Sequence, residues 1–194
     1  WVVPLSPFGW PETRARVDAA LARAKKPGKS ALTRALKRAL LTGQYNWARR
    51  YFTRHPDRVA VAWNGLTGGR MVFLQAARDA GAATLYAELA PLPGRITLDP
   101  IGVNAESSIP HDPAFYRQFQ GTGWREMGKT LTARPSRRAD VMQSNDTLPD
   151  APFLFCPLQV PDDSQVRLFA GWTQDYTGFI AALTKAVPHL PQGW

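Results

Sequence analysis

The sequence predicts an α/β protein organised around a Rossmann-like parallel sheet. An apolar, β-branched run at residues 58–63 is interrupted by the glycine-rich stretch 64–69, which is typical of a strand followed by a tight loop. Residues 70–80 then show helical spacing, and Gly81 ends the helix. A second strand is predicted at residues 84–88. A strand–helix–strand unit of this length is the crossover that joins two parallel strands.

Three helices are predicted before this unit, after an extended, proline-containing entry at residues 1–12. Residues 12–26 form the first, with one apolar stripe. Residues 31–41 form the second, with Ser30 as its N-cap and Gly43 as its stop, and residues 44–53 form the third. The apolar side chains of the second helix are expected to face the core: Leu32, Ala35, Leu36, Ala39 and Leu40.

After the strand–helix–strand unit, the pattern predicts a short strand at residues 96–99 and a helical turn at 113–119. The domain division expected is an N-terminal domain at 1–133, a linker at 134–151 and the start of a second domain at 152–194. Within that second domain, residues 152–160 are predicted to be a buried strand and residues 175–187 a helix. A single strand followed by a single helix cannot bury both faces of a sheet.

Composition excludes several classes of protein. The 194 residues are 44% hydrophobic, which is enough for a core, but no run of about 18 apolar residues predicts a membrane-spanning helix. The single cysteine, Cys156, is expected in the core and excludes an internal disulfide, which fits a reducing cytoplasm. Three scattered histidines and one cysteine predict no metal site.

The net charge of +9 is concentrated in the first third of the chain. Such a basic surface attracts nucleic acid, anionic lipid headgroups or acidic small substrates, and charge alone does not choose among them. Solvation of the outer helix faces is the simpler explanation and is favoured here. Aromatic residues do not alternate along one basic face as a nucleic-acid stacking platform requires, so we do not expect nucleic acid to be the partner.

In α/β proteins, ligands bind beyond the carboxyl ends of the strands. In this sequence, the 64–69 loop and the segment after Glu88 follow those ends. The loop opens a helix and predicts an anion site to which Arg70 adds a charge, although an ordinary tight turn explains it equally well. Glu88 and Asp99 are carboxylates at strand ends and, as a pair, suit sugar transfer, although each alone is more often structural. His111 is a candidate acid or substrate contact in a loop. Asp163 can cap a helix or bind ligand hydroxyls, and capping is favoured.

Several motifs occur in one order: WNGLTGGR at 63–70, ELAPLPG at 88–94, LDPIGVNAESSIP at 98–110, PLQV at 157–160 and Asp-Ser at 163–164. Together they resemble the capsular polysaccharide biosynthesis family, which includes bacterial transferases of Kdo (3-deoxy-D-manno-octulosonic acid). The resemblance covers roughly residues 58–185. Several spaced motifs in one order are more specific than any single motif.

The resemblance implies a metal-independent glycosyltransferase of GT-B-like architecture, without a cofactor, that moves Kdo from CMP-Kdo to a lipid-linked acceptor. It implies retention of configuration through a covalent sugar–carboxylate intermediate, with Glu88 as the first candidate for the active-site carboxylate and Asp99 as the second. It also implies a cytoplasmic location, peripheral contact with an anionic inner-membrane surface, and capsule assembly proteins as further partners. The substrate-binding residues expected from the loop, the motifs and the polar segments together are Asn64, Gly65, Gly68, Arg70, Asn104, Ser107 or Ser108, His111, Gln159 and Asp163.

Two departures from the family pattern bear on activity. Ala90 stands where the family has glycine, which changes the turn after Glu88. The family also continues into a nucleotide-binding region beyond the last motif found here, so the 194 residues correspond to a truncated part of such an enzyme and are expected to have little transfer activity alone. The competing hypothesis is a non-catalytic module that binds an acidic glycan or an anionic lipid.

Overall fold

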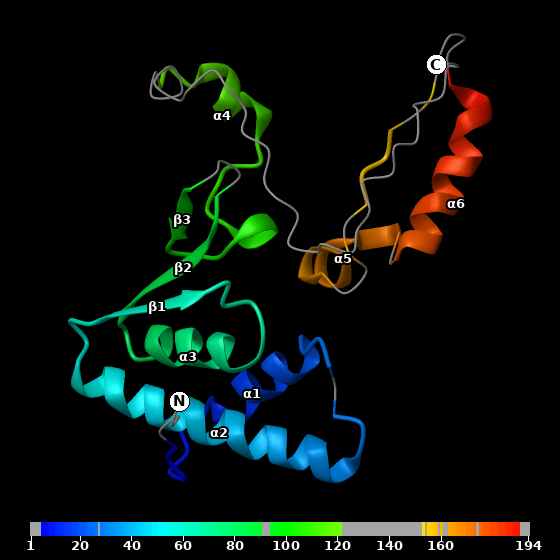
Figure 1. Ribbon diagram of the computed structural model, residues 1–194. Coiled ribbons are helices and arrows are strands. Elements are labelled where there is room, and N and C mark those ends of the chain that lie inside the picture. Colours follow the sequence, from blue (N-terminus) through cyan, green and yellow to red (C-terminus); the bar gives the residue numbers. More distant parts are fainter. Residues whose placement is uncertain are drawn as a thin grey trace.

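The computed structural model describes residues 5–26, 28–90, 94–121, 153, 155–158, 160, 163–173 and 175–190. Its elements, in chain order and as labelled in Figure 1, are α1 (Thr13–Ala22), α2 (Ala31–Arg54), β1 (Val59–Trp63), α3 (Gly68–Asp79), β2 (Ala83–Leu89), β3 (Ile96–Asp99), the 3-10 turn η1 (Asn104–Glu106), α4 (Pro113–Gln118), α5 (Ser164–Phe169), η3 (Gly171–Thr173), α6 (Tyr176–Ala186) and η4 (Val187–His189).

The predicted strand–helix–strand unit is confirmed. β1 and β2 pair in parallel, with Val59 opposite Ala83 and Trp63 opposite Ala87, and α3 is the crossover between them. β3 pairs antiparallel to β2, so the sheet has the order β1-β2-β3 and is mixed rather than wholly parallel. The reason is the length of the connection: Ala90 N–H donates to the carbonyl of Arg95 at 3.0 Å, and so short a turn can only return the chain antiparallel. The protein is therefore α/β with a small mixed sheet.

Helices cover only one face of this sheet in the described part of the chain. Ala60, Thr84 and Tyr86 point toward α3 and are buried. The opposite face carries apolar side chains of which between 42% and 56% of the surface is exposed: Val59, Val61, Trp63, Leu89, Ile96 and Leu98. A parallel strand pair normally has both faces covered, so this face is unusual.

The stripe of α1 is confirmed, since Val17, Ala20 and Ala24 are buried. The predicted break at Gly43 is wrong, because α2 runs without interruption from Ala31 to Arg54. Gly43 has another role: the segment that precedes α1 crosses α2 there, with Ser6 N–H donating to the Gly43 carbonyl at 3.0 Å. A Cβ at position 43 would lie 3.0 Å from Leu5 Cβ and Cδ2, so a larger residue would require Leu5 to shift.

The predicted inward face of the second helix is also wrong. All five residues named above are exposed in the structure, with Leu32, Leu36 and Leu40 showing 69%, 55% and 58% of their surface. The buried residues of α2 begin at Leu41 and continue through Tyr45, Ala48 and Phe52 on the opposite side of the helix. With 24 residues, α2 is twice as long as the α3 helix on which it packs, and its N-terminal half extends beyond the core.

The C-terminal elements differ in part from the prediction. The described residues of the predicted 152–160 strand form no strand, and Phe153, Phe155, Leu158 and Val160 are 45–77% exposed. A strand needs a partner edge to satisfy its backbone, and none of the described strands pairs with this segment. Cys156 is consequently half-buried and not a core residue. The predicted linker at 134–151 lies outside the described residues.

The predicted cap at Asp163 is confirmed, and Asp175 caps the last helix in the same way. Asp163 accepts from Gln165 N–H at 2.7 Å to begin α5, and Asp175 accepts from Gly178 N–H at 2.9 Å to begin α6. α5 contacts the first helices through Arg167, which donates to the Ala24 carbonyl at 3.0 Å. Figure 1 shows α6 apart from the sheet, and it buries no residue. None of the helices in the described ranges has the length and apolar character needed to cross a bilayer.

Candidate functional site

Glu88 lies near the carboxyl end of β2, on the face of the sheet that α3 covers. Its two carboxylate oxygens are held separately: Oε2 accepts from Asn64 Nδ2 at 2.9 Å, and Oε1 accepts from the Leu89 N–H at 2.9 Å. The side chain is half-buried. The carboxylate is thus fixed in direction while remaining accessible.

Asn64 owes its position to the turn after β1. Its φ of 64° lies in the left-handed region, which asparagine tolerates better than most residues. Its N–H donates to the Ala87 carbonyl at 2.7 Å, and its Oδ1 accepts from Leu66 N–H at 3.3 Å. Since the parallel pairing of β1 and β2 sets the ends of both strands side by side, Asn64 reaches Glu88 across the sheet edge.

An open pocket of about 670 Å³ surrounds this pair. It is lined by Lys25, Gln44, Trp63, Asn64, Thr67, Gly69, Arg70, Glu88, Asp163 and Ser164. Four of the predicted site residues therefore come together: Asn64, Arg70, Glu88 and Asp163. They derive from the β1–α3 loop, the start of α3, β2 and the start of α5.

The pocket has the electrostatics of an anion site. The N-terminus of α3 faces it through Thr67, Gly69 and Arg70, and the N-cap residue Thr67 makes no side-chain hydrogen bond to the first N–H groups. Side-chain oxygens cap the described helices α2, α4, α5 and α6, whereas α1 like α3 has no such cap. The dipole of α3 and the Arg70 and Lys25 side chains together favour a bound phosphate or carboxylate. Arg70 is held at the rim by a bond from Nη1 to the Trp63 carbonyl at 2.9 Å.

Asp99 is buried at the end of β3 and is saturated with hydrogen bonds. Oδ1 accepts from the N–H groups of Ile101 and Gly102 at 2.8 and 3.0 Å. Oδ2 accepts from the N–H and the hydroxyl of Ser108 at 2.8 and 2.7 Å. Burial opposes ionisation, but the bonds from Gly102, Ser108 and Ile101 together outweigh it and lower the pKa of Asp99 to about 2. These contacts fold the 99–108 loop around one carboxylate.

We expect Asp99→Asn to destabilise the protein by roughly 2 kcal/mol at neutral pH, because an amide cannot accept all four bonds. The folded-state pKa lies below the unfolded value of about 3.9, so the stabilisation is present above that value and is lost as the pH falls toward 2. Urea unfolding at several pH values should show the difference between wild type and variant shrinking below about pH 4. Asp112→Asn, which removes an exposed cap of α4, is the control and should show no such large difference. A constant difference from pH 7 to 2 would contradict the ionised state of Asp99.

The other predicted residues lie elsewhere. Gly65 and Ser107 line a second pocket of about 480 Å³, which shares no lining residue with the first. Asn104 is exposed, and its carbonyl accepts from the Ser107 hydroxyl at 2.7 Å. Gly68 begins α3, and His111 is exposed before α4, so neither lines these two pockets. Gln159 lies outside the described residues.

Two lining residues of the Glu88 pocket lie outside every motif that the sequence analysis identified: Lys25 and Gln44. Gln44 comes from the middle of α2, and its side chain lies against Gly69 at the start of α3. The local sequence pattern does not identify Gln44 as a pocket residue, because its position in the pocket depends on how α2 packs on α3. Lys25 belongs to the basic run after α1, and only the fold shows which of those cations faces the pocket.

The described residues contain no group of three or more histidine, cysteine or acidic side chains placed to hold a metal ion. The Glu88 pocket contains an oriented, accessible carboxylate, that of Glu88, together with the cationic side chains of Arg70 and Lys25. Asp163, the other carboxylate at its wall, is occupied as the cap of α5.

Comparison with known proteins gives one distant relative. The chain is similar to Protein FixF of Sinorhizobium fredii (strain NBRC 101917 / NGR234), with 27% identity in an alignment of 175 residues that covers 83% of this chain. The chain spans 42% of the length of that protein. No protein-family model matches the sequence. No solved structure matches it either.

Proposed function

We propose that this chain is the acceptor-side part of a capsule-type glycosyltransferase that moves Kdo from CMP-Kdo to a lipid-linked acceptor. The observation that carries the proposal is the oriented Glu88 carboxylate in an anion-binding pocket at the end of β2. The spaced motifs that resemble the capsular polysaccharide family supply the substrate class. A GT-B-like arrangement, with a second domain facing this pocket, is part of the proposal.

In this proposal Glu88 is the nucleophile. Its carboxylate attacks the anomeric carbon of Kdo, the bond from that carbon to the CMP phosphate oxygen breaks, and CMP leaves with the electron pair. The acceptor hydroxyl then attacks the same carbon, loses its proton to solvent, and releases the Glu88 carboxylate. The hydrogen-bond geometry supports Glu88 over Asp99, because each oxygen of Asp99 already accepts two hydrogen bonds and each oxygen of Glu88 accepts one.

The positive side of the pocket suits the donor. CMP-Kdo carries a phosphate and a sugar carboxylate, and the α3 N-terminus, Arg70 and Lys25 supply complementary charge. In this scheme Asn64 acts as a positioning residue, since it holds one oxygen of Glu88 and leaves the carboxylate pointing into the pocket.

The alternative is a module that binds an acidic glycan or an anionic lipid without turnover. The saturation of Asp99 favours it, because the second carboxylate expected for sugar transfer is occupied. Release of CMP from CMP-Kdo by the full-length protein, with and without a lipid-linked acceptor, separates the two. Acceptor-dependent release supports the transferase. Binding of the donor, of an acidic glycan or of an anionic lipid without release of CMP supports the module, and binding of none of the three overturns both.

A further inference from the structure

The outer face of α2 combines apolar and cationic side chains along its full length, and its apolar side chains are exposed except for Trp47, which is half-buried against the core. Leu32, Leu36, Leu40, Trp47 and Tyr51 fall within about 100° of the helix circumference, at the standard 3.6 residues per turn. Leu5 fills the gap over Gly43, between Leu40 and Trp47, and is 51% exposed. We call these six residues the α2 ridge. The core-facing side of α2 lies opposite.

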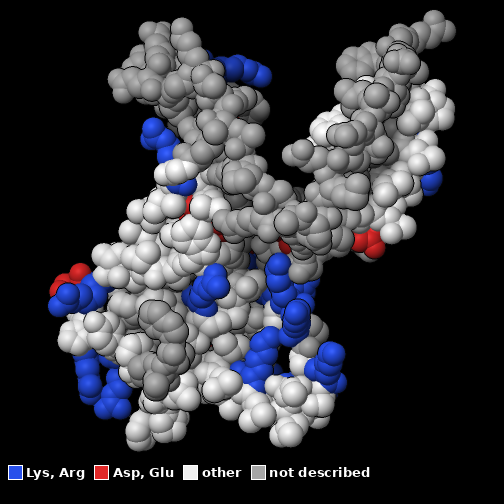
Figure 2. Space-filling model, in the orientation of Figure 1, with Lys and Arg blue, Asp and Glu red and all other residues white. Residues whose placement is uncertain are grey.

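The surroundings of the α2 ridge are strongly basic. Between Asp18 and Asp57 the sequence contains ten Lys or Arg residues and no Asp or Glu, and three of the ten form ion pairs: Arg23 with Glu106, Arg38 with Asp18 and Arg49 with Glu12. Lys29, Arg50 and Arg54 flank the ridge, and all three are exposed. On the face drawn in Figure 2, Lys and Arg side chains gather over the lower part, where Figure 1 places α1 and α2.

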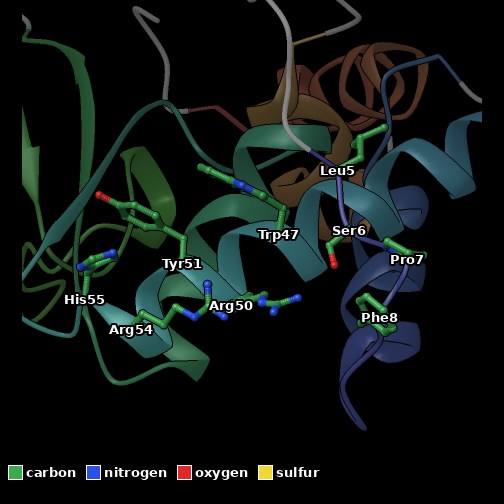
Figure 3. Close-up of a pocket in the computed structure, with 9 residues that line it drawn as sticks. All are labelled: Leu5, Ser6, Pro7, Phe8, Trp47, Arg50, Tyr51, Arg54 and His55. Atoms are coloured by element: carbon green, nitrogen blue, oxygen red, sulfur yellow. The ribbon is translucent and has the colours of Figure 1, made fainter.

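The C-terminal part of the ridge has the composition of a membrane–water interface. Trp47 stacks on Tyr51 with ring centroids 5.5 Å apart. The centroids of the Tyr51 and His55 rings are 4.7 Å apart. Figure 3 shows Arg50 reaching from α2 toward Phe8, whose ring lies 5.9 Å from the guanidinium carbon and is 71% exposed. Arg50 and Arg54 line an open pocket of about 400 Å³ beside these rings. Amphipathic aromatic rings next to arginines are typical of residues at the level of lipid headgroups.

We propose that the α2 ridge docks this protein on an anionic lipid bilayer, with the leucines and aromatic rings inserted at the acyl boundary and the flanking cations on the headgroup phosphates. The C-terminal half of α2 is fixed into the fold by its opposite face, on which Leu41, Tyr45, Ala48 and Phe52 are buried, and a bilayer is the planar partner that buries the remaining side of a fixed helix. Leucine side chains offer no flat surface for stacking on nucleic-acid bases. Two copies of the ridge would bring like charges together.

This inference extends the proposed function, because an enzyme with a lipid-linked acceptor works at a membrane surface. Gln44, which lines the Glu88 pocket, lies on α2 between Leu40 and Trp47 in sequence. A docked ridge therefore brings the helix that forms one wall of the pocket to the bilayer. The test below contains no donor or acceptor, so its failure is distinguishable from failure of the proposed transferase.

The experiment is flotation of the chain with phosphatidylcholine vesicles, with or without phosphatidylglycerol. We expect binding only when phosphatidylglycerol is present, and weaker binding at high ionic strength. The triple variant Leu32→Gln/Leu36→Gln/Leu40→Gln should reduce binding about tenfold or more, since three exposed leucines lose their apolar contact. Its control is Ile109→Gln/Ile180→Gln/Val187→Gln, three apolar residues 50–58% exposed and distant from α2 in sequence, which should bind as wild type.

A second pair of variants tests the charges. Lys29→Gln/Arg50→Gln/Arg54→Gln should also reduce binding about tenfold or more, at roughly 1 kcal/mol for each cation at an anionic surface. Arg95→Gln/Arg117→Gln/Lys185→Gln removes the same charge from exposed positions outside α2 and should change binding much less. Circular dichroism melting checks that all variants are folded.

Three outcomes would overturn the proposal. The first is equal binding by the ridge variants and their controls, or no binding by wild type. The second is a ridge-dependent dimer in sedimentation velocity without ridge-dependent vesicle binding, which would assign the surface to a second copy of the chain. The third is ridge-dependent binding of an RNA oligonucleotide without ridge-dependent vesicle binding, which would assign it to nucleic acid.

Discussion

Glu88→Gln in the full-length protein should lower transfer from CMP-Kdo by about 10⁴-fold or more, the order of loss expected when a nucleophile is removed. The amide has nearly the size of the carboxylate but cannot form the sugar ester. We expect the thermal midpoint to fall by less than about 4 °C, because only one half-exposed hydrogen bond, from Asn64 or Leu89, is lost, at a cost of about 1 kcal/mol. The measurements are CMP release and differential scanning calorimetry.

Glu12→Gln is the matched control for Glu88→Gln. Glu12 accepts a hydrogen bond from Arg49 Nε at 2.8 Å and lies outside the Glu88 pocket. It should lose a similar amount of stability and keep its transfer rate. If Glu88→Gln transferred sugar at a rate near that of wild type, Glu88 would have no part in the mechanism.

Gly65→Ala should destabilise the protein by about 3 kcal/mol, the sum of overpacking and an unfavourable left-handed backbone. The φ of Gly65 is 74°, and an added Cβ would lie 2.5 Å from Leu74 Cδ1 and 2.7 Å from Tyr86 Cδ1. Both neighbours are buried, so neither can move aside without disturbing the contact between α3 and β2. For a chain of this size the melting temperature should fall by about 6–12 °C.

Gly68→Ala separates the two contributions in Gly65→Ala. Gly68 also has a positive φ, 57°, but nothing lies within 4 Å of the position that a Cβ would take. It should cost only about 1–2 kcal/mol, the backbone contribution alone. Equal losses for both variants in calorimetry would mean that close packing at Gly65 contributes nothing.

The strand–helix–strand unit could be predicted because its signals are local. Branched apolar residues, a glycine loop and helical spacing each depend on neighbours in the sequence, and together they require a parallel crossover. The same local reasoning failed at Gly43, since glycine in a helix can stop it or make room for another segment. It also failed for Leu32, Leu36 and Leu40, because periodicity identifies an apolar face but not what covers it.

The candidate site was predictable to the same extent. Asn64 and Glu88 end adjacent parallel strands, so topology alone brings them together. The different burial and hydrogen bonding of Glu88 and Asp99 could not be predicted from sequence spacing, since both carboxylates lie near strand ends. Only the path of the 99–108 loop, which returns Ser108 to Asp99, separates them. The contribution of Gln44 depends on the packing of two helices, which a linear pattern does not contain.

The uncovered face of the sheet has a practical consequence for work with this chain. Among the described residues, this face presents a hydrophobic surface beside the edge of β1, with which no described strand pairs: Val59, Val61, Trp63, Leu89, Ile96 and Leu98. Surfaces of this kind bind one another and bind reporter dyes for exposed apolar area. A purified sample should therefore show concentration-dependent self-association that mild detergent reverses. Sample concentration and detergent content consequently belong among the controlled variables of every solution experiment on this protein.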